Sequence, residues 1–354
     1  MEIVPFKAKK FKYFIGIDVS KKTLDYAVMY ESKLLFHQLG QNDPSDILTF
    51  ISTLKTIPKF TIAKTVFCME HTGIYCNHLL YSLKRSKANM VMENPLLIKK
   101  FLDLTRGKND KADAIQIASY AQKNRDELTL WTWRRPVLVE LMSLFGLRNR
   151  LLTTAVALKT PLEEQEPYIQ KYIQKQCVQL CHKSLISINA DLLNIDLKID
   201  QLINSDEHLK RLTELITSVP SIGRVTALRI LISTNEFRDI NDPKKFACYA
   251  GVAPFKMESG QVQRKARISH FANKKMKSLL HLCALTAVRC DEGIKAYYIR
   301  KTQIEGKPKL AVINAIRYKL IVRIFACVRQ NRNYEKNYAR PKKLTASGLI
   351  KCEV

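Results

Sequence analysis

The chain has 354 residues, which is enough for two ordinary domains. Hydrophobic residues make up 46% of it and charged residues 26%, a composition that excludes a disordered chain and is typical of a globular protein with a sizeable core. Lys and Arg number 59 against 32 Asp and Glu, a net charge of +27. This excess favours a polyanionic partner, with nucleic acid the commonest, over the alternative of a merely basic soluble surface.

Membrane and disulfide-rich classes do not fit the sequence. No stretch approaches the roughly 18 continuous apolar residues of a membrane span, and no apolar run of signal-peptide length follows the first basic residues. Nine cysteines are scattered without CxxC pairs, which argues against a disulfide framework. We therefore expect a cytoplasmic protein without a membrane partner.

Residues 10–130 have the pattern of an α/β domain. Three strands are expected within residues 12–40, in FIGIDVS, LDYAVMY and KLLFHQLG. Helical spacing follows at residues 44–57, then a strand in TVFCME, a helix in NHLLYSLKRS and a strand in ANMVMEN. Residues 109–123 are again helical in spacing. Strands followed by alternating strands and helices predict a mixed sheet.

Residues 136–210 form a different, helical segment. Apolar residues step by three and four positions from Leu185 to Leu202, the spacing of a coiled-coil seam. An ordinary helical hairpin packed on its own domain has the same spacing, so both alternatives stay open. In either case the segment is expected to be a spacer or a dimerisation element.

Residues 211–332 are expected to form a mainly helical C-terminal domain, followed by a basic tail at 333–354. The helical pattern is interrupted at Gly223, at residues 239–243 and in the turn region 251–260. From residue 211 to the end there are 29 basic and ten acidic side chains, so most of the charge excess lies here.

Four carboxylates stand out in the N-terminal domain. Asp18 and Glu70 each lie at the end of an expected buried strand, while Asp110 and Asp113 share one face at the start of a helix. Converging carboxylates repel one another unless Mg²⁺, which prefers oxygen ligands, neutralises them. Taken singly, each acid is better explained by a turn or a helix start, and only the set of four, in this order along an α/β pattern, points to a metal site.

The segment SVPSIGRVTALRI resembles a helix-hairpin-helix. Its turn at Gly223 and Arg224 leads into a helix, whose first backbone amides can hold a phosphate. An ordinary glycine turn between two core helices is the alternative.

Residues 251–277 combine cations with a Ser-Gly turn at Ser259. A serine is a weak nucleophile without activation, and a Ser-Gly pair alone usually indicates only a turn. The cations are expected to contact nucleic-acid phosphates. They are Lys256, Arg264, Lys265, Arg267, Lys274, Lys275 and Lys277.

Together these motifs resemble one family of insertion-sequence transposases, in which an N-terminal RuvC-like domain of RNase H type is joined to a C-terminal serine transposase domain. The resemblance extends through most of residues 12–330, with a mild departure at Gly-Val-Ala-Pro, residues 251–254. Its motifs are GIDVSKKTLDYAV, MEHTGIY, KNDKADAIQIA, SVPSIGRVTALRIL, KKFACYAGVAPFKMESG, RISHFANKKMKSLLHLCALTA and EGKPKLAVINAIRYKL.

The resemblance implies a residue-by-residue mechanism. Asp18, Glu70, Asp110 and Asp113 would form an Asp-Glu-Asp-Asp tetrad that binds two Mg²⁺ ions, and Ser259 would attack DNA phosphodiesters. Donor and target DNA, a bridge RNA as guide, and a homo-oligomer (dimer or tetramer) are the partners it implies. Two alternatives are a hydrolytic RuvC-like nuclease, in which water attacks, and a non-enzymatic basic nucleic-acid-binding protein.

Overall fold

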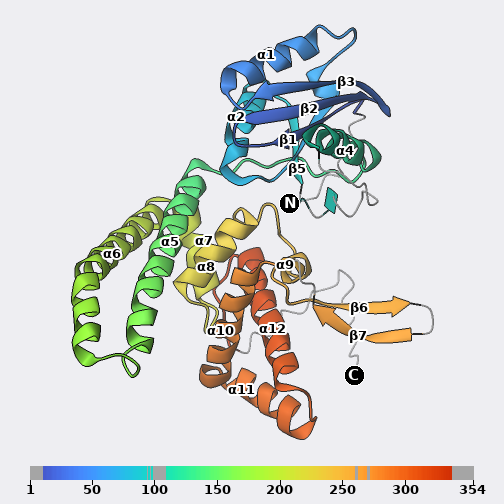
Figure 1. Cartoon of the computed structure of the whole chain (residues 1–354). Coiled ribbons are helices and arrows are strands. Elements are labelled where there is room, and N and C mark those ends of the chain that lie inside the picture. The colour runs from blue at the N-terminus through green and yellow to red at the C-terminus, as the bar shows by residue number, and fades with distance from the viewer. Residues whose placement is uncertain are drawn as a thin grey trace, which may run out of the picture. The chain divides into compact units, whose positions relative to one another are not determined.

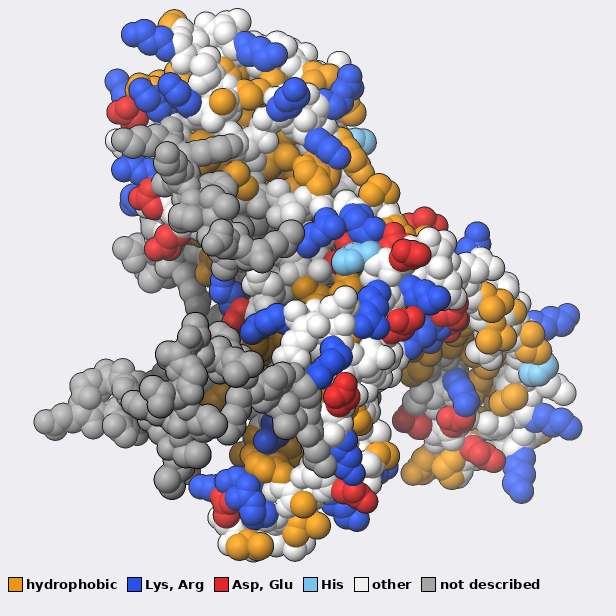
Figure 2. Space-filling view, turned by 180° about the vertical axis from the view of Figure 1, so that it is seen from behind, with side chains coloured by type: hydrophobic (Ala, Val, Ile, Leu, Met, Phe, Trp, Pro, Cys, Tyr) orange, Lys and Arg blue, Asp and Glu red, His pale blue; other side chains and the backbone are white. Residues whose placement is uncertain are grey.

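The structure is a computed structural model that describes residues 11–93, 95, 97–98, 109–259, 262–268 and 272–336, but not the side chains of 255–268. Residues 337–354 of the expected tail therefore lie outside it. The chain divides into two units, Met1–Trp133 and Arg134–Val354. Lys and Arg side chains are spread over the face seen in Figure 2. Within the described part, no helix is long and apolar enough to cross a membrane.

The first unit is built on a five-stranded mixed sheet (Figure 1). Its order is β3-β2-β1-β4-β5, with antiparallel pairing of β1 with β2 and β2 with β3, and parallel pairing of β1 with β4 and β4 with β5. The sequence predictions of these strands and of a mixed sheet are confirmed. The strands are β1 (Tyr13–Val19), β2 (Thr23–Tyr30), β3 (Lys33–Gln41), β4 (Thr65–Glu70) and β5 (Asn89–Glu93).

Helices cover both faces of this sheet because each central strand alternates between two apolar cores. On one face, α1 (Pro44–Lys55) and α2 (Asn77–Arg85) pack on the side chains of Ile15 and Ile17. On the other face lies α4 (Asp110–Lys123), as Figure 1 shows. It packs on Phe14 and its neighbours. Short 3₁₀ turns, η1 (Ile62–Lys64) and η2 (Gly73–Cys76), precede β4 and α2.

The described part of the second unit is mainly helical, with a two-stranded hairpin (Figure 1). That hairpin, β6 with β7, occupies the region that the sequence indicated only as a turn. The elements are α5 (Pro136–Glu164), α6 (Lys171–Ser205), α7 (Glu207–Thr217), α8 (Arg224–Thr234), α9 (Pro243–Tyr249), β6 (Pro254–Ser259), β7 (Val262–Ile268), α10 (Lys274–Cys290), α11 (Glu292–Ile299), the π-helical η3 (Arg300–Ile304) and α12 (Lys309–Gln330).

Helices α5 and α6 pack against each other as a long hairpin. The apolar seam predicted in residues 185–202 contributes Ile195 and Ile199 to the same core as Leu141 and Phe145 of α5. The seam therefore packs within its own unit, as the helical-hairpin alternative expects.

A single arginine ties the start of α5 to two distant segments. Arg135 forms a bidentate ion pair with Asp206, with N–O distances of 2.7 and 2.9 Å, and it also donates hydrogen bonds to Glu236. The Glu236 side chain is fully buried. A buried carboxylate is tolerated only when it is paired, so Arg135 fixes the base of the hairpin to the helical core.

Candidate functional site

Two acidic residues lie at the same edge of the sheet because β1 and β4 are parallel neighbours. The last registered pair is Ile17 with Met69, so Asp18 and Glu70 follow it side by side. Side chains alternate along a strand, which places Asp18 on the face of Gly16 and Phe14. That face is covered by α4.

Helix α4 begins at this edge and brings two further carboxylates. Asn109 caps it, its side chain accepting a 3.1 Å hydrogen bond from the Lys111 amide. Asp110 and Asp113 lie in the first turn. Carboxylate oxygens of Asp18, Asp110 and Asp113 all lie within 4.8 Å of one another. The predicted convergence is therefore present for three of the four acids.

Mutual repulsion is evident at Asp18. Burial, followed by the charges of Asp113, Asp110, Glu70 and Asp25, raises its pKa to about 6. Glu70 thus acts on Asp18 although it is not one of the three acids in closest contact. An all-oxygen cluster of this charge suits a hard divalent cation, which would offset the repulsion.

Sequence reasoning missed two polar residues beside the cluster. Asp25 of β2 is paired directly with Asp18 across the β1–β2 ladder, and its side chain is 2.8 Å from Nε2 of His37. It is 7% exposed, an unusual burial for an acid. The signal was available, since Asp25 interrupts the apolar strand LDYAVMY.

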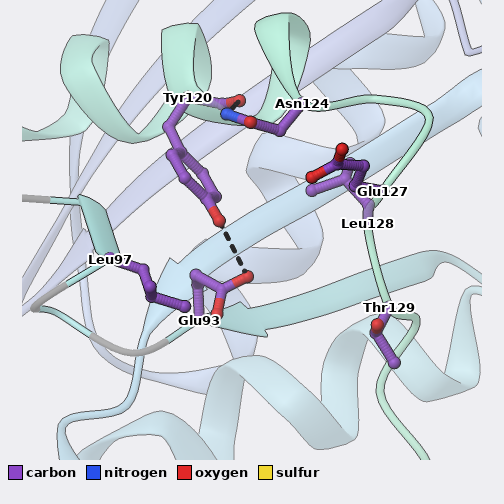
Figure 3. A pocket seen from close by; sticks show the side chains of 7 residues that line it. All are labelled: Glu93, Leu97, Tyr120, Asn124, Glu127, Leu128 and Thr129. Carbon is purple, nitrogen blue, oxygen red and sulfur yellow. Dashed lines mark hydrogen bonds between the residues drawn. The ribbon is translucent and has the colours of Figure 1, made fainter. Parts of the chain in front are cut away.

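Glu93, at the end of β5, was also missed, although it repeats the pattern of an acid that ends a buried strand. It is in register with Glu70. Figure 3 shows Tyr120 of α4 pointing toward it, and the tyrosine hydroxyl donates a 3.2 Å hydrogen bond to its carboxylate. Burial and then the charge of Glu93 raise the pKa of Tyr120, so the hydroxyl stays protonated. Both residues line a pocket of about 520 Å³.

Ser259 and four of the predicted phosphate-binding cations lie on the β6–β7 hairpin. Ser259 is the last residue of β6 and is in register with Val262. Its side chain and those of Lys256, Arg264, Lys265 and Arg267 lie outside the description, so their predicted contacts stay predictions. Lys274 and Lys275 are exposed in the first turn of α10.

The segment predicted to resemble a helix-hairpin-helix consists of α7 and α8, which contact each other across the turn 218–223, and the motif itself stays a prediction. Gly223 precedes α8 and is exposed. Arg224 is instead held by α6: it pairs with Asp200 at 2.8 Å and donates to the Asp196 carbonyl at 2.9 Å. In the structure Arg224 links the start of α8 to α6. Phosphate binding at this turn stays a prediction.

Two protein-family models match this chain. A family model described as a transposase, that of the DEDD transposases of IS110, matches residues 15–165. A second, described as the transposase IS116/IS110/IS902 family, matches residues 213–299. The chain is a transposase of the IS110/IS116/IS902 family. The acids of the cluster, Asp18, Asp110 and Asp113, all fall within the first match.

Several known proteins are similar to this transposase, over shares of its length that range from a third to most of it. A pilin gene-inverting protein of Moraxella bovis is 25% identical over 337 residues, which cover 92% of this chain and 98% of the relative. An uncharacterized 43.6 kDa protein of insertion element IS110 from Streptomyces coelicolor is 23% identical, covering 46% of this chain and 39% of the relative. A Thermus thermophilus RuvC structure matches 34% of the transposase and 99% of its own chain, with 14% identity and a TM-score of 0.25.

Proposed function

We propose that this transposase cuts and rejoins DNA by a divalent-metal-dependent transesterification in which Ser259 is the nucleophile. The observation that carries the proposal is the approach of Asp18, Asp110 and Asp113 to within 4.8 Å of one another, in a chain that matches transposase models. Glu70 completes the proposed tetrad from the neighbouring strand.

The tetrad carboxylates would hold two Mg²⁺ ions through oxygen ligands, which is the donor chemistry that Mg²⁺ prefers. Bound there, Mg²⁺ supplies Lewis-acid polarisation of a phosphate and stabilisation of a leaving oxygen. The protein's own part is to position the carboxylates: β1 and β4 fix two of them, and the N-terminal turn of α4 fixes the others.

Ser259 would exchange one phosphodiester for another. Its hydroxyl oxygen attacks phosphorus and loses its proton, a bond from serine to phosphorus forms, and the bond to one deoxyribose oxygen breaks. The released strand end leaves with its oxygen protonated. Because the number of phosphoester bonds is unchanged, the reverse step can rejoin a strand without an external energy source.

Rejoining, and not only cutting, is supported by the Moraxella bovis relative. Its name says that it inverts a pilin gene. Inverting a DNA segment requires that every strand end that is released is joined again, whereas a hydrolytic nuclease leaves free ends. Similarity over 92% of this chain supports the same type of chemistry here.

We further propose that the transposase works as a homo-oligomer, dimer or tetramer, on donor and target DNA with a guide RNA. The large positive charge suits two kinds of nucleic acid. A composite site is proposed in which Ser259 of one protomer serves the tetrad of another. Self-association is supported by a second apolar face of α6, exposed at Ile186, Leu193 and Leu197. Replacing Leu193 and Leu197 with Glu should lower the mass measured by light scattering.

Denaturing electrophoresis of labelled donor DNA tests the nucleophile. Wild-type protein should leave a covalent adduct at one DNA end that only protease removes, whereas Ser259→Ala should give neither adduct nor recombination. Asp18→Asn should lose the adduct as well. Normal cutting by Ser259→Ala, with free DNA ends, would overturn the serine mechanism in favour of hydrolysis.

A further inference from the structure

A cleft of about 660 Å³ lies between three helices of the second unit. One wall is the stretch of α5 from Met142 to Thr154, and the others are given by α8 and α10. Three of the lining side chains are cations, Arg150, Arg229 and Lys275, each from a different helix. No Asp or Glu is among the described residues that line it.

Arg229 is a partly buried cation without a counterion among the described residues. Its guanidinium lies over the Phe145 ring, 4.8 Å from the centroid, and its Nε is buried with no hydrogen-bond partner. Burial lowers the pKa of Arg229. By contrast, Arg148 on the same stretch of α5 pairs with Asp196 at 2.8 Å. A desolvated cation without a partner is costly, so an anion in the cleft would be favoured there.

The start of α10 adds a second feature that favours an anion. Lys274, Lys275 and Lys277 all lie in the first turn, which contains no acid, and Asn273 caps it. The N-terminus of a helix carries partial positive charge, so lysines there are unfavourable by themselves. An anion at this end would interact favourably with both the lysines and the helix dipole.

Gly146, in the middle of α5, is not explained by packing. Glycine in a helix interior costs about 1 kcal/mol relative to alanine. A Cβ at Gly146 would meet a single atom of the described structure within 4 Å, the tip of Arg150 at 3.7 Å, which is ordinary contact. Gly146 lines the cleft. Glycine at such a position is understandable when a ligand approaches the backbone closely.

We propose that this cleft binds the phosphodiester backbone of a DNA strand, with Arg150, Arg229 and Lys275 contacting its phosphates. The proposal rests on the proposed function, since a transposase must hold DNA. It adds Arg150, Arg229 and Gly146 to the residues that contact nucleic acid, at a place apart from the β6–β7 hairpin. Lys275, in the first turn of α10, is both one of the cations predicted from the sequence to contact phosphates and one of the residues that line the cleft.

Two substitutions separate binding from folding. Arg229→Met keeps the packing against Phe145 but removes the charge, so binding should weaken while the midpoint of thermal unfolding stays equal or rises. Gly146→Ala should raise that midpoint and weaken binding. If Arg229 and Gly146 had only a structural role, each substitution would instead lower the midpoint of thermal unfolding. The control is Arg289→Met, an equal charge loss at an exposed site about 21 Å along α10 from Lys275.

Binding is measured by fluorescence anisotropy of labelled oligonucleotides over a KCl series, with EDTA present. Arg229→Met should reduce the slope of log Kd against log KCl concentration by about 0.9 for duplex DNA or about 0.7 for single-stranded DNA, and Arg289→Met should not. Equal slopes for Arg229→Met and wild type overturn the proposal. An effect confined to an RNA oligonucleotide overturns the assignment to DNA.

Because EDTA excludes cleavage, this measurement does not depend on the chemistry at Ser259. If Ser259→Ala cuts DNA normally, the serine mechanism fails while the cleft result stands. If the slopes do not change while the Ser259 adduct forms, the cleft proposal fails while the mechanism stands.

Discussion

Gly16 of β1 lies directly against Ala118 of α4. A Cβ on Gly16 would come within 2.9 Å of the Ala118 Cα and closer still to the carbonyl oxygen of Ala114, nearer than real Cβ atoms approach. The missing side chain therefore lets α4 rest on the sheet. Since α4 also carries Asp110 and Asp113, this contact sets how near they come to Asp18.

Gly16→Ala should therefore separate the carboxylates by pushing α4 away from β1. We expect a loss of stability of about 1–3 kcal/mol, typical of an overpacked core, and a loss of the thermal stabilisation produced by Mn²⁺ or Mg²⁺. Urea unfolding and thermal melts with and without metal measure both. Gly223→Ala, where a Cβ meets open space, is the control: it should keep the metal stabilisation and lose only the small stability that glycine provides at the N-cap of α8. Unchanged metal stabilisation in Gly16→Ala would contradict this account.

Asp113→Asn tests the repulsion within the cluster. The change removes one of the charges that raise the pKa of Asp18, so without metal the protein should melt at a higher temperature than wild type. With Mg²⁺ the variant should gain little stability and should not cleave DNA. If Asp113 served only to stabilise the start of α4, Asp113→Asn would instead lower the melting temperature without metal, because losing an acid from the first turn lowers helix stability. Calorimetry with and without Mg²⁺ distinguishes the two.

Arg135→Met should be among the most damaging substitutions outside the proposed site. It leaves the fully buried Glu236 without its main partner, at a cost of about 3–5 kcal/mol. Lys336→Met is the matched control, because its partner Glu292 is 86% exposed and such pairs contribute little. Chemical denaturation of the two variants gives the comparison. A small effect of Arg135→Met would contradict this account and would point to Arg238, 4.0 Å from the Glu236 carboxylate, as a sufficient partner.

Acid should weaken the same junction. The hydrogen bond from Arg135 lowers the pKa of Asp206 to about 2, below the value near 3.9 expected when the chain is unfolded. A lowered pKa gives stability that is complete above pH 4 and is lost as the pH falls toward 2. We expect this loss to be about 1–2 kcal/mol after solvent screening. Asp206→Asn keeps a residue that can cap α7, so its stability deficit should shrink over that pH range.

The strands and the acids at their ends could be predicted because both depend on local pattern. A buried strand shows as a short apolar run, and an acid that ends it stands out, as Asp18 and Glu70 do. Asp25 visibly interrupts an apolar strand, but its place beside Asp18 depends on the antiparallel register, which apolar patterning does not give. Glu93 carried the local signal, but its partner Tyr120 lies 27 residues away.

The second unit was less predictable because its key contacts join segments far apart in the chain. Arg135 and Glu236 are separated by 101 residues, and no periodicity links them. Arg224 illustrates the same limit: its position at a helix start suggested a phosphate ligand, while the partners it has in the structure are Asp196 and Asp200 of α6. Charge alone did not reveal which cations were already paired.

The α5–α6 hairpin has a consequence for reach. From Pro136 to Pro161, α5 rises about 1.5 Å per residue, so its far end stands roughly 39 Å from the Arg135 junction. Antiparallel packing with α6 and the Arg148–Asp196 pair stiffen the two helices against bending. A molecule that binds the connection at residues 165–170 is therefore held at a fixed distance from the helical core. The length of the hairpin sets that distance. Shortening both helices by equal numbers of turns would change that separation in steps of about 5.4 Å.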